Sequence, residues 1–215
     1  MAIASYIDHT LLRPDTTSGA VKALCKEAQE HQFAAVCIPP FFVSNAVAQL
    51  KKTSVKIATV IGYPMGYATT PAKVEEIKRA LSDGAQEVDV VINICAVKDQ
   101  NWNYVQNDID SMCTAVRLKG KTIKVIIETG LLTEAEMIKL CEICNESEPN
   151  FVKTSTGING HGARVEDVAL LRKHLKKTIK IKASGGIRSA QDVRQLIDAG
   201  AERIGSSTGV AIVNG

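Results

Sequence analysis

Apolar positions along the chain alternate between two spacings. Short apolar runs of strand length are separated by longer stretches in which apolar residues recur at helical spacing, as Val74, Ile77 and Leu81 do. The pattern predicts strands and helices in strict alternation from one end of the chain to the other. The predicted strands are 7–12, 34–39, 56–62, 87–93, 124–129, 151–156, 180–185 and 203–208.

Boundary residues support the predicted helices. Thr133 is followed three residues later by Glu136, which is the pattern of a capping box. In "TPAKVEEIKRALSDG" we expect Thr70 as N-cap, Pro71 in the first helical position and Gly84 just past the end.

Strand–helix alternation is typical of crossover units and a parallel sheet. Eight such units in 215 residues predict an α/β fold of the (β/α)8 TIM-barrel type, in a single domain over residues 1–215. The rival is a doubly wound open sheet. A dinucleotide-binding sheet of that type needs G-x-G-x-x-G after its first strand, and the sequence lacks it there.

The predicted strands place charged side chains inside this barrel. Side chains alternate across a strand, and apolar Val88 and Val90 belong on the helix-covered face, so Asp89 faces the axis. The same alternation applied to the other strands turns further polar residues inward. The inward set includes Asp8, Cys37, Glu87, Asp89, Asn93, Ile126, Glu128, Lys153, Lys180 and Lys182.

Buried charges of this kind fit two interpretations. They form either an ion-pair network that only satisfies itself, or a catalytic cluster at the carboxyl-end mouth of the barrel. A lysine amine with a pKa of about 10.4 is roughly 0.04% neutral at pH 7, and a second ammonium nearby with partial desolvation lowers that pKa. Lys153 and Lys182 on consecutive strands, with Asp89 to exchange protons, therefore predict Schiff-base chemistry.

Two glycine- and serine-rich stretches follow the last two strands. They are "SGGIRS", with Gly185 and Gly186, and "SSTGVA", with Ser206 and Ser207. In barrels these loops frequently bind phosphate, and glycine lets backbone amides approach the anion closely. We expect a phosphate site there, with Gly157 after the sixth strand as a further contact.

The composition of the chain limits the kinds of molecule that we expect it to bind. Lysine and arginine are spread along the chain and aromatic residues make up 4%, so we expect no nucleic-acid partner. The longest apolar run, 33–43, is too short for a membrane span. Six scattered cysteines indicate a reduced, cytoplasmic protein, and Cys141-x-x-Cys144 lies in a predicted helix, where we expect core packing and no metal.

The residues resemble those of the deoxyribose-phosphate aldolases. The matching blocks cover nearly the whole chain, and "FVKTSTG" with "IKASGGIRS" is the most specific pair. The resemblance implies a class I aldolase that reversibly cleaves 2-deoxy-D-ribose 5-phosphate to acetaldehyde and D-glyceraldehyde 3-phosphate, without a cofactor, as a homodimer. Lys153 matches the Schiff-base lysine, and Asp89 and Lys182 match the proton-transfer pair. The expected supporting residues are Asp8, Cys37, Glu128 and Thr154.

The chain departs from this family pattern at two positions. Cys95 stands where many relatives have glycine, and Ile158 stands where some have lysine. Three other functions remain open: a Schiff-base aldolase or transaldolase for a longer sugar phosphate, a phosphate-binding isomerase, and an inactive barrel that only binds sugar phosphates.

Overall fold

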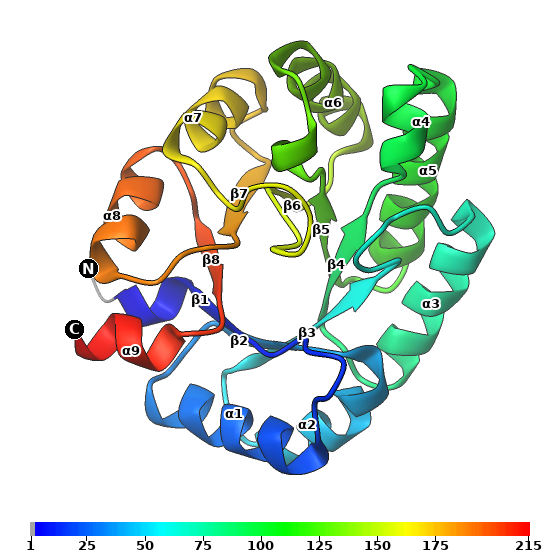
Figure 1. The fold of residues 1–215 in the computed structure, drawn as a ribbon. Coiled ribbons are helices and arrows are strands. Elements are labelled where there is room, and N and C mark those ends of the chain that lie inside the picture. Colours follow the sequence, from blue (N-terminus) through cyan, green and yellow to red (C-terminus); the bar gives the residue numbers. More distant parts are fainter. Residues whose placement is uncertain (1–2) are drawn as a thin grey trace.

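The strands close into a parallel barrel in which each pairs with its neighbours in chain order and β1 pairs with β8 (Figure 1). The computed structural model describes residues 3–215, so the first two residues of the predicted domain lie outside it. The predicted TIM barrel is confirmed. The strands are β1 (Ile7–Thr10), β2 (Ala35–Ile38), β3 (Lys56–Ile61), β4 (Glu87–Val91), β5 (Thr122–Ile126), β6 (Phe151–Lys153), β7 (Lys180–Ser184) and β8 (Arg203–Ser206).

Helices surround this barrel on the outside, as Figure 1 shows in the view along its axis. Short 3-10 turns lie at Ile3–Tyr6, Pro40–Phe42 and Thr129–Leu131. The α-helices are α1 (Ser18–Glu30), α2 (Val43–Leu50), α3 (Thr70–Ser82), α4 (Ile94–Lys98), α5 (Trp102–Arg117), α6 (Glu134–Ser147), α7 (Val165–His174), α8 (Ala190–Asp198) and α9 (Gly209–Asn214).

Most strands end earlier than their apolar runs predict. The sixth was predicted over 151–156, and β6 ends at Lys153 because the next residues leave the ladder to form a loop at the barrel mouth. Lys180, predicted to face inward, is exposed at the opposite end of the barrel. Asn93, predicted as an inward strand residue, is the N-cap of α4.

Helix starts agree with the sequence signals to within one residue. Thr133 caps α6 in a complete capping box with Glu136. The predicted N-cap of α3 was wrong by one position, since Thr69 holds it and Thr70 is the first helical residue. Gly84 follows α3 in the left-handed region, as expected of a helix stop.

Thr133→Ala is expected to lower the free energy of unfolding by about 1 kcal/mol, because the Glu136 N–H in the first turn of α6 loses its capping partner, the Thr133 hydroxyl. Urea unfolding monitored by circular dichroism measures the change. Thr133→Ser keeps the hydroxyl and should unfold within a few tenths of a kcal/mol of the parent. An equal loss in both variants would contradict the capping explanation.

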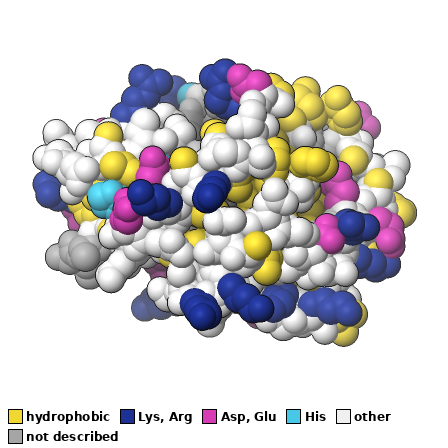
Figure 2. All heavy atoms as spheres, turned by 90° about the horizontal axis from the view of Figure 1, so that it is seen from below, with side chains coloured by type: hydrophobic (Ala, Val, Ile, Leu, Met, Phe, Trp, Pro, Cys, Tyr) yellow, Lys and Arg dark blue, Asp and Glu magenta, His cyan; other side chains and the backbone are white. Residues whose placement is uncertain are grey.

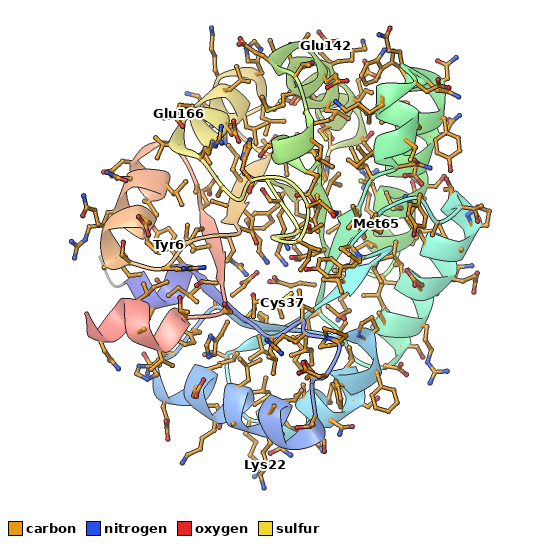
Figure 3. All side chains as sticks on the ribbon, in the orientation of Figure 1. Tyr6, Lys22, Cys37, Met65, Glu142 and Glu166 are labelled. Carbon is orange, nitrogen blue, oxygen red and sulfur yellow. The ribbon has the colours of Figure 1, made fainter. Side chains whose placement is uncertain are left out.

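The inner wall of the barrel has two different halves. The side of β2 and β3 carries a small apolar cluster of Ala35, Cys37, Ala58 and Val60. Figure 3 shows Cys37 toward the barrel centre, whereas Lys22 and Glu142 lie on the outer helices. The remaining strands supply the inner wall with acidic and basic side chains, so the apolar core proper lies between the strands and the helices.

A buried ion pair also lies outside the barrel, between helices α3 and α5. Lys73 of α3 lies 2.6 Å from Asp108 of α5, and both side chains are fully buried. Lys73 Nζ also donates to the carbonyls of Gly66 and Val91, and Thr70 donates to Asp108. The pair thus fixes the β3–α3 loop against α5 and the end of β4.

The surface carries charges of both signs. Figure 2 shows Lys and Arg side chains spread over one side of the molecule, with Asp and Glu among them. Within residues 3–215 there is no helix with the length and apolar character required to cross a membrane.

Candidate active site

Lys153, Asp89 and Lys182 meet inside the barrel. Lys153 Nζ donates to Asp89 Oδ2 at 2.8 Å, and Lys182 Nζ donates to the same oxygen at 2.7 Å. Lys153 and Lys182 are direct partners in the register of β6 and β7. All three side chains are buried, with Lys153 at 2% exposure. The structure therefore brings together the three residues that the strand alternation turned inward.

Asp89 and Lys182 also belong to a larger arrangement in which each carboxylate lies between two cations. On one side, Lys182 Nζ donates to Asp8 of β1. On the other side, Lys124 Nζ of β5 lies 2.8 Å from Asp89 Oδ1 and 2.6 Å from Glu87 Oε2. Lys124 also lies 3.8 Å from Asp8 Oδ2, across the centre.

Arg203, the first residue of β8, closes this arrangement. Its Nη1 lies 2.7 Å from Asp8 Oδ1 and 3.1 Å from Glu87 Oε2. Three carboxylates balance three cations, so the net charge is zero when all are ionised. We call this set the charge ring; in order around it, the members are Asp89, Lys182, Asp8, Arg203, Glu87 and Lys124.

Lys153 is attached to the charge ring at one point. Its ion-pair partner within residues 3–215 is Asp89, through an oxygen that it shares with Lys182. Counting Lys153, four cations face three carboxylates, which leaves one excess positive charge. Each cation of the ring itself contacts two carboxylates.

The charge ring holds Asp89 and Lys182 in their charged forms. Burial acts to raise the pKa of Asp89, but Lys124, Lys153 and Lys182 outweigh it and hold that pKa well below its usual range. Burial acts to lower the pKa of Lys182, but Asp8 and Asp89 outweigh it, so this pKa lies above the ordinary value. Lys182 therefore stays an ammonium at neutral pH.

Asp8 is held in its charged form in the same way, whereas burial keeps Cys37 neutral. The pKa of Asp8 is lowered: burial opposes this, but Lys182, Lys124 and Arg203 outweigh it. Burial raises the pKa of the Cys37 thiol to about 11, with a further contribution from Asp89. Cys37 is thus a neutral thiol in the apolar half of the wall.

Sequence reasoning missed Lys124 and Arg203. Lys124 precedes Ile126 by two residues, so the alternation that turned Ile126 inward places Lys124 on the inner face too. Arg203 is a charged residue at the start of a predicted strand, which in the sequence suggests a solvent-facing position, although its side chain is only 16% exposed in the structure. Only the closure of β8 onto β1 brings it to Asp8.

The loop between β6 and α7 lies over the barrel mouth, where it is yellow in Figure 1. Thr156 of this loop donates its N–H and its hydroxyl to Glu128, at 3.0 and 2.5 Å. Tyr63 donates to the Thr156 carbonyl and Asn159 donates to the Pro64 carbonyl, which ties the loop to the β3–α3 loop. These contacts explain why Lys153 is almost inaccessible.

Two predicted supporting residues hydrogen-bond to neighbouring loops and strand ends. Glu128 follows the end of β5 in the left-handed region, and its carboxylate accepts hydrogen bonds from Thr156 and Asn159 of the β6–α7 loop. Burial raises the pKa of Glu128 despite these bonds. Thr154 joins the ends of β6 and β7, since its hydroxyl accepts from the Ser184 N–H at 3.1 Å.

The predicted phosphate residues lie on the loops after β6, β7 and β8. Gly157, Gly185 and Gly186 all have positive φ, which suits glycine. A side chain on Gly185 would come within 3.2 Å of the Gly157 Cα, so these two loops touch. Ser207 is exposed, but the Ser206 hydroxyl is buried and already donates to the Ile187 carbonyl at 2.9 Å. Ser206 therefore has its backbone to offer a ligand.

The comparisons with known proteins agree on one family. Residues 2–214 match the model of the DeoC/LacD family aldolases. The chain belongs to this aldolase family. The deoxyribose-phosphate aldolase 1 of Oceanobacillus iheyensis is 47% identical over 215 residues, covering 100% of this chain and 97% of the relative. The deoxyribose-phosphate aldolase of Listeria monocytogenes serotype 4a is 50% identical over 216 residues, and the alignment covers 100% of this chain and 96% of the relative.

A solved structure of another aldolase resembles this DeoC/LacD family member in both fold and sequence. The tetrameric deoxyribose phosphate aldolase of Aeropyrum pernix is 31% identical, with a TM-score of 0.92, covering 99% of this chain and 89% of that one. The chain is accordingly an aldolase on a TIM barrel.

The two departures from the family pattern lie near the mouth. Ile158 is 62% exposed in the β6–α7 loop, and Cys95 is an exposed free thiol on α4. Cys141 and Cys144 are both buried on α6, which confirms that they pack in the core.

Proposed function

We propose that this aldolase reversibly cleaves 2-deoxy-D-ribose 5-phosphate to acetaldehyde and D-glyceraldehyde 3-phosphate through a Schiff base on Lys153. The main support for the proposal is that Lys153 adds one positive charge to a charge ring that is otherwise neutral. Lys153 can lose its proton while every ring carboxylate keeps two cationic partners. Lys124 and Lys182 cannot do so, because each bridges two carboxylates.

The same charge balance favours the steps that follow. In the synthetic direction, neutral Lys153 attacks the acetaldehyde carbonyl, water leaves, and a cationic imine forms. Loss of a methyl proton then gives a neutral enamine: the C–H electron pair forms the C=C bond, and the π pair of the C=N bond moves onto nitrogen. Because the imine shares Asp89 with Lys124 and Lys182, this neutralisation removes the one excess positive charge of Lys153 and the charge ring. The enamine carbon then attacks the aldehyde carbon of glyceraldehyde 3-phosphate.

Asp89 and Lys182 are placed to assist these proton transfers. Lys182 is held as an ammonium and can donate a hydrogen bond near Lys153, to a substrate oxygen or to the water that carries the proton. Asp89 Oδ2 bridges the two lysines and stabilises the cationic imine when it forms. Asp89 is a weak base in this setting, because three cations keep its pKa low, so water carries the remaining proton movements.

The substrate phosphate is assigned to the loops after β6, β7 and β8. Gly157, Gly185 and Gly186 allow backbone amides to approach it closely, and Ser207 adds an exposed hydroxyl. The relatives whose names specify deoxyribose phosphate support this choice of substrate. No cofactor or metal takes part in the proposed reaction.

Borohydride trapping tests the proposed intermediate. Incubation with acetaldehyde and sodium borohydride, followed by peptide mass spectrometry, should place an ethyl group on Lys153 and leave Lys124 and Lys182 unmodified. Absence of the adduct in a protein that turns over deoxyribose phosphate would favour a non-covalent mechanism. Comparison of glyceraldehyde 3-phosphate with longer aldehydes as acceptors separates this activity from that of a transaldolase.

Two further expectations about assembly and location accompany this proposal. We expect a homodimer in the cytoplasm, although the Aeropyrum pernix relative is a tetramer. Light scattering coupled to size exclusion measures the oligomeric state directly.

A further inference from the structure

The charge ring extends well beyond the groups that can touch a substrate. Glu87 and Arg203 are the first residues of β4 and β8, so they lie at the amino ends of parallel strands. The proposed chemistry occurs at the opposite, carboxyl end, where Lys153 is the last residue of β6. The ring therefore links the two ends of the barrel through ion pairs.

Two routes of ion pairs run from Arg203 to Lys153. One passes through Asp8 and Lys182 to Asp89, and the other passes through Glu87 and Lys124 to the same carboxylate. Every link in both routes is 3.1 Å or shorter. All members except Arg203 have side chains at most 6% exposed, so solvent screens these charges little.

The charge of Arg203 decides whether the ring is neutral. Arg203 stays cationic throughout the working pH range, since its pKa is raised: burial opposes this, but Asp8 and Glu87 outweigh it. Without this cation the ring would carry one net negative charge, and protonated Lys153 would then balance it. Without Glu87 the ring would carry one net positive charge and would repel the Lys153 ammonium more strongly.

Other titratable groups also face Lys153 or its carboxylate partner. They come from each element packed around the mouth: Asp8 of β1, Cys37 of β2, Tyr63 of the β3–α3 loop, Lys124 of β5, Glu128 after β5 and Lys182 of β7. Cys37 and Tyr63 are neutral near pH 7, because burial raises the pKa of each. Asp8, Lys124 and Lys182 are members of the charge ring, whereas Arg203 and Glu87 belong to it from the amino ends of their strands.

We propose that Arg203 and Glu87 are positioning residues that control the protonation state of Lys153 from the opposite end of the barrel. Arg203 makes the ring neutral, so that Lys153 becomes the excess cation and readily loses its proton. Neither residue is the nucleophile or donates a proton to the substrate. This inference rests on the proposed Schiff-base function of Lys153.

The test compares the pH dependence of kcat/KM in charge variants. Arg203→Met should move the acidic limb of the profile to higher pH by about one unit, which is a tenfold loss at a fixed pH on that limb. Glu87→Gln should move the limb to lower pH. Opposite shifts from the two variants distinguish charge control from a structural defect, which would lower the rate equally at every pH.

Two further variants serve as controls for Arg203→Met. Lys180 begins the neighbouring strand, and its Nζ lies 5.8 Å from the centroid of the Phe151 ring, much as the Arg203 guanidinium carbon lies 5.4 Å from it. Lys180 is exposed and is not part of the charge ring. Lys180→Met and Arg203→Lys should both retain the parental profile, the first because its charge is outside the ring and the second because the charge is kept.

A second readout separates this inference from the proposed function. The rate at which cyanate carbamylates Lys153, followed by peptide mass spectrometry at a series of pH values, reports its protonation without any substrate. A folded Arg203→Met protein whose carbamylation and kcat/KM profiles both coincide with the parent would overturn the role of Arg203. If Arg203→Met fails to fold, Glu87→Gln carries the test alone, and an unshifted profile overturns the proposal. Failure of borohydride trapping in the parent would instead reject the Schiff base.

Discussion

Lys153→Leu is expected to reduce aldol turnover by about 10⁴-fold or more, because no other amine in the site can replace it as nucleophile. Lys182 and Lys124 remain ammonium ions bridging two carboxylates each, so neither takes over. Steady-state assays that couple glyceraldehyde 3-phosphate release to a dehydrogenase measure the loss.

Lys153→Leu should lose activity without losing stability. The charge ring stays neutral without Lys153, and replacing a buried excess charge by an apolar side chain is often neutral or stabilising. We therefore expect a Tm equal to or above that of the parent, with binding of the phosphorylated product nearly intact. Lys180→Leu, at an exposed position, should change neither quantity. Substantial residual turnover in Lys153→Leu would show that the nucleophile is another residue.

Asp89→Asn is expected to lower the free energy of unfolding by about 3–5 kcal/mol. The carboxylate lies within 2.8 Å of Lys124, Lys153 and Lys182, and the neutral amide would leave three buried ammonium groups without it. Urea denaturation measures the change. Asp99→Asn, at the exposed end of α4, should stay within about 0.5 kcal/mol of the parent.

The difference between Asp89→Asn and the parent should depend on pH. The pKa of Asp89 lies lower in the folded protein than in the unfolded chain, so its contribution is complete above about pH 4 and is lost as the pH falls further. The two proteins should therefore approach one another in stability in acid. Adding Lys153→Leu to Asp89→Asn should recover part of the loss, because Lys124 keeps Glu87 and Lys182 keeps Asp8, whereas Lys153 is left without a carboxylate partner. Strict additivity of the two changes would argue against the proposed charge balance.

Strand periodicity was enough to predict the barrel and the inward direction of its polar side chains. Asp89 and Lys182 lie within strands whose apolar neighbours must face the helices, so their orientation follows from alternation alone. Lys153 follows Val152 in the same way. The convergence of these three residues could therefore be predicted before any coordinates were known.

The positions of Arg203 and Glu128 depend on how the strands pair and where they end, which the sequence pattern does not show. Arg203 looks like an exposed strand end in the sequence, and only the pairing of β8 with β1 brings it to Asp8. Glu128 was predicted inside a strand, yet β5 ends two residues earlier and its carboxylate binds Thr156. Alternation assigns a side chain to a face, but it does not determine which strands neighbour one another or where each ladder ends.

The sequence by itself determined the fold class and the chemical character of the barrel interior, because both depend on local spacing. The tertiary structure alone decided the charge balance, because it depends on which carboxylate lies between which cations. Lys153 and Lys182 are both inward lysines in the sequence. In the folded protein Lys182 bridges Asp8 and Asp89, whereas Lys153 shares one oxygen of Asp89, and that difference makes Lys153 the excess cation on a neutral charge ring.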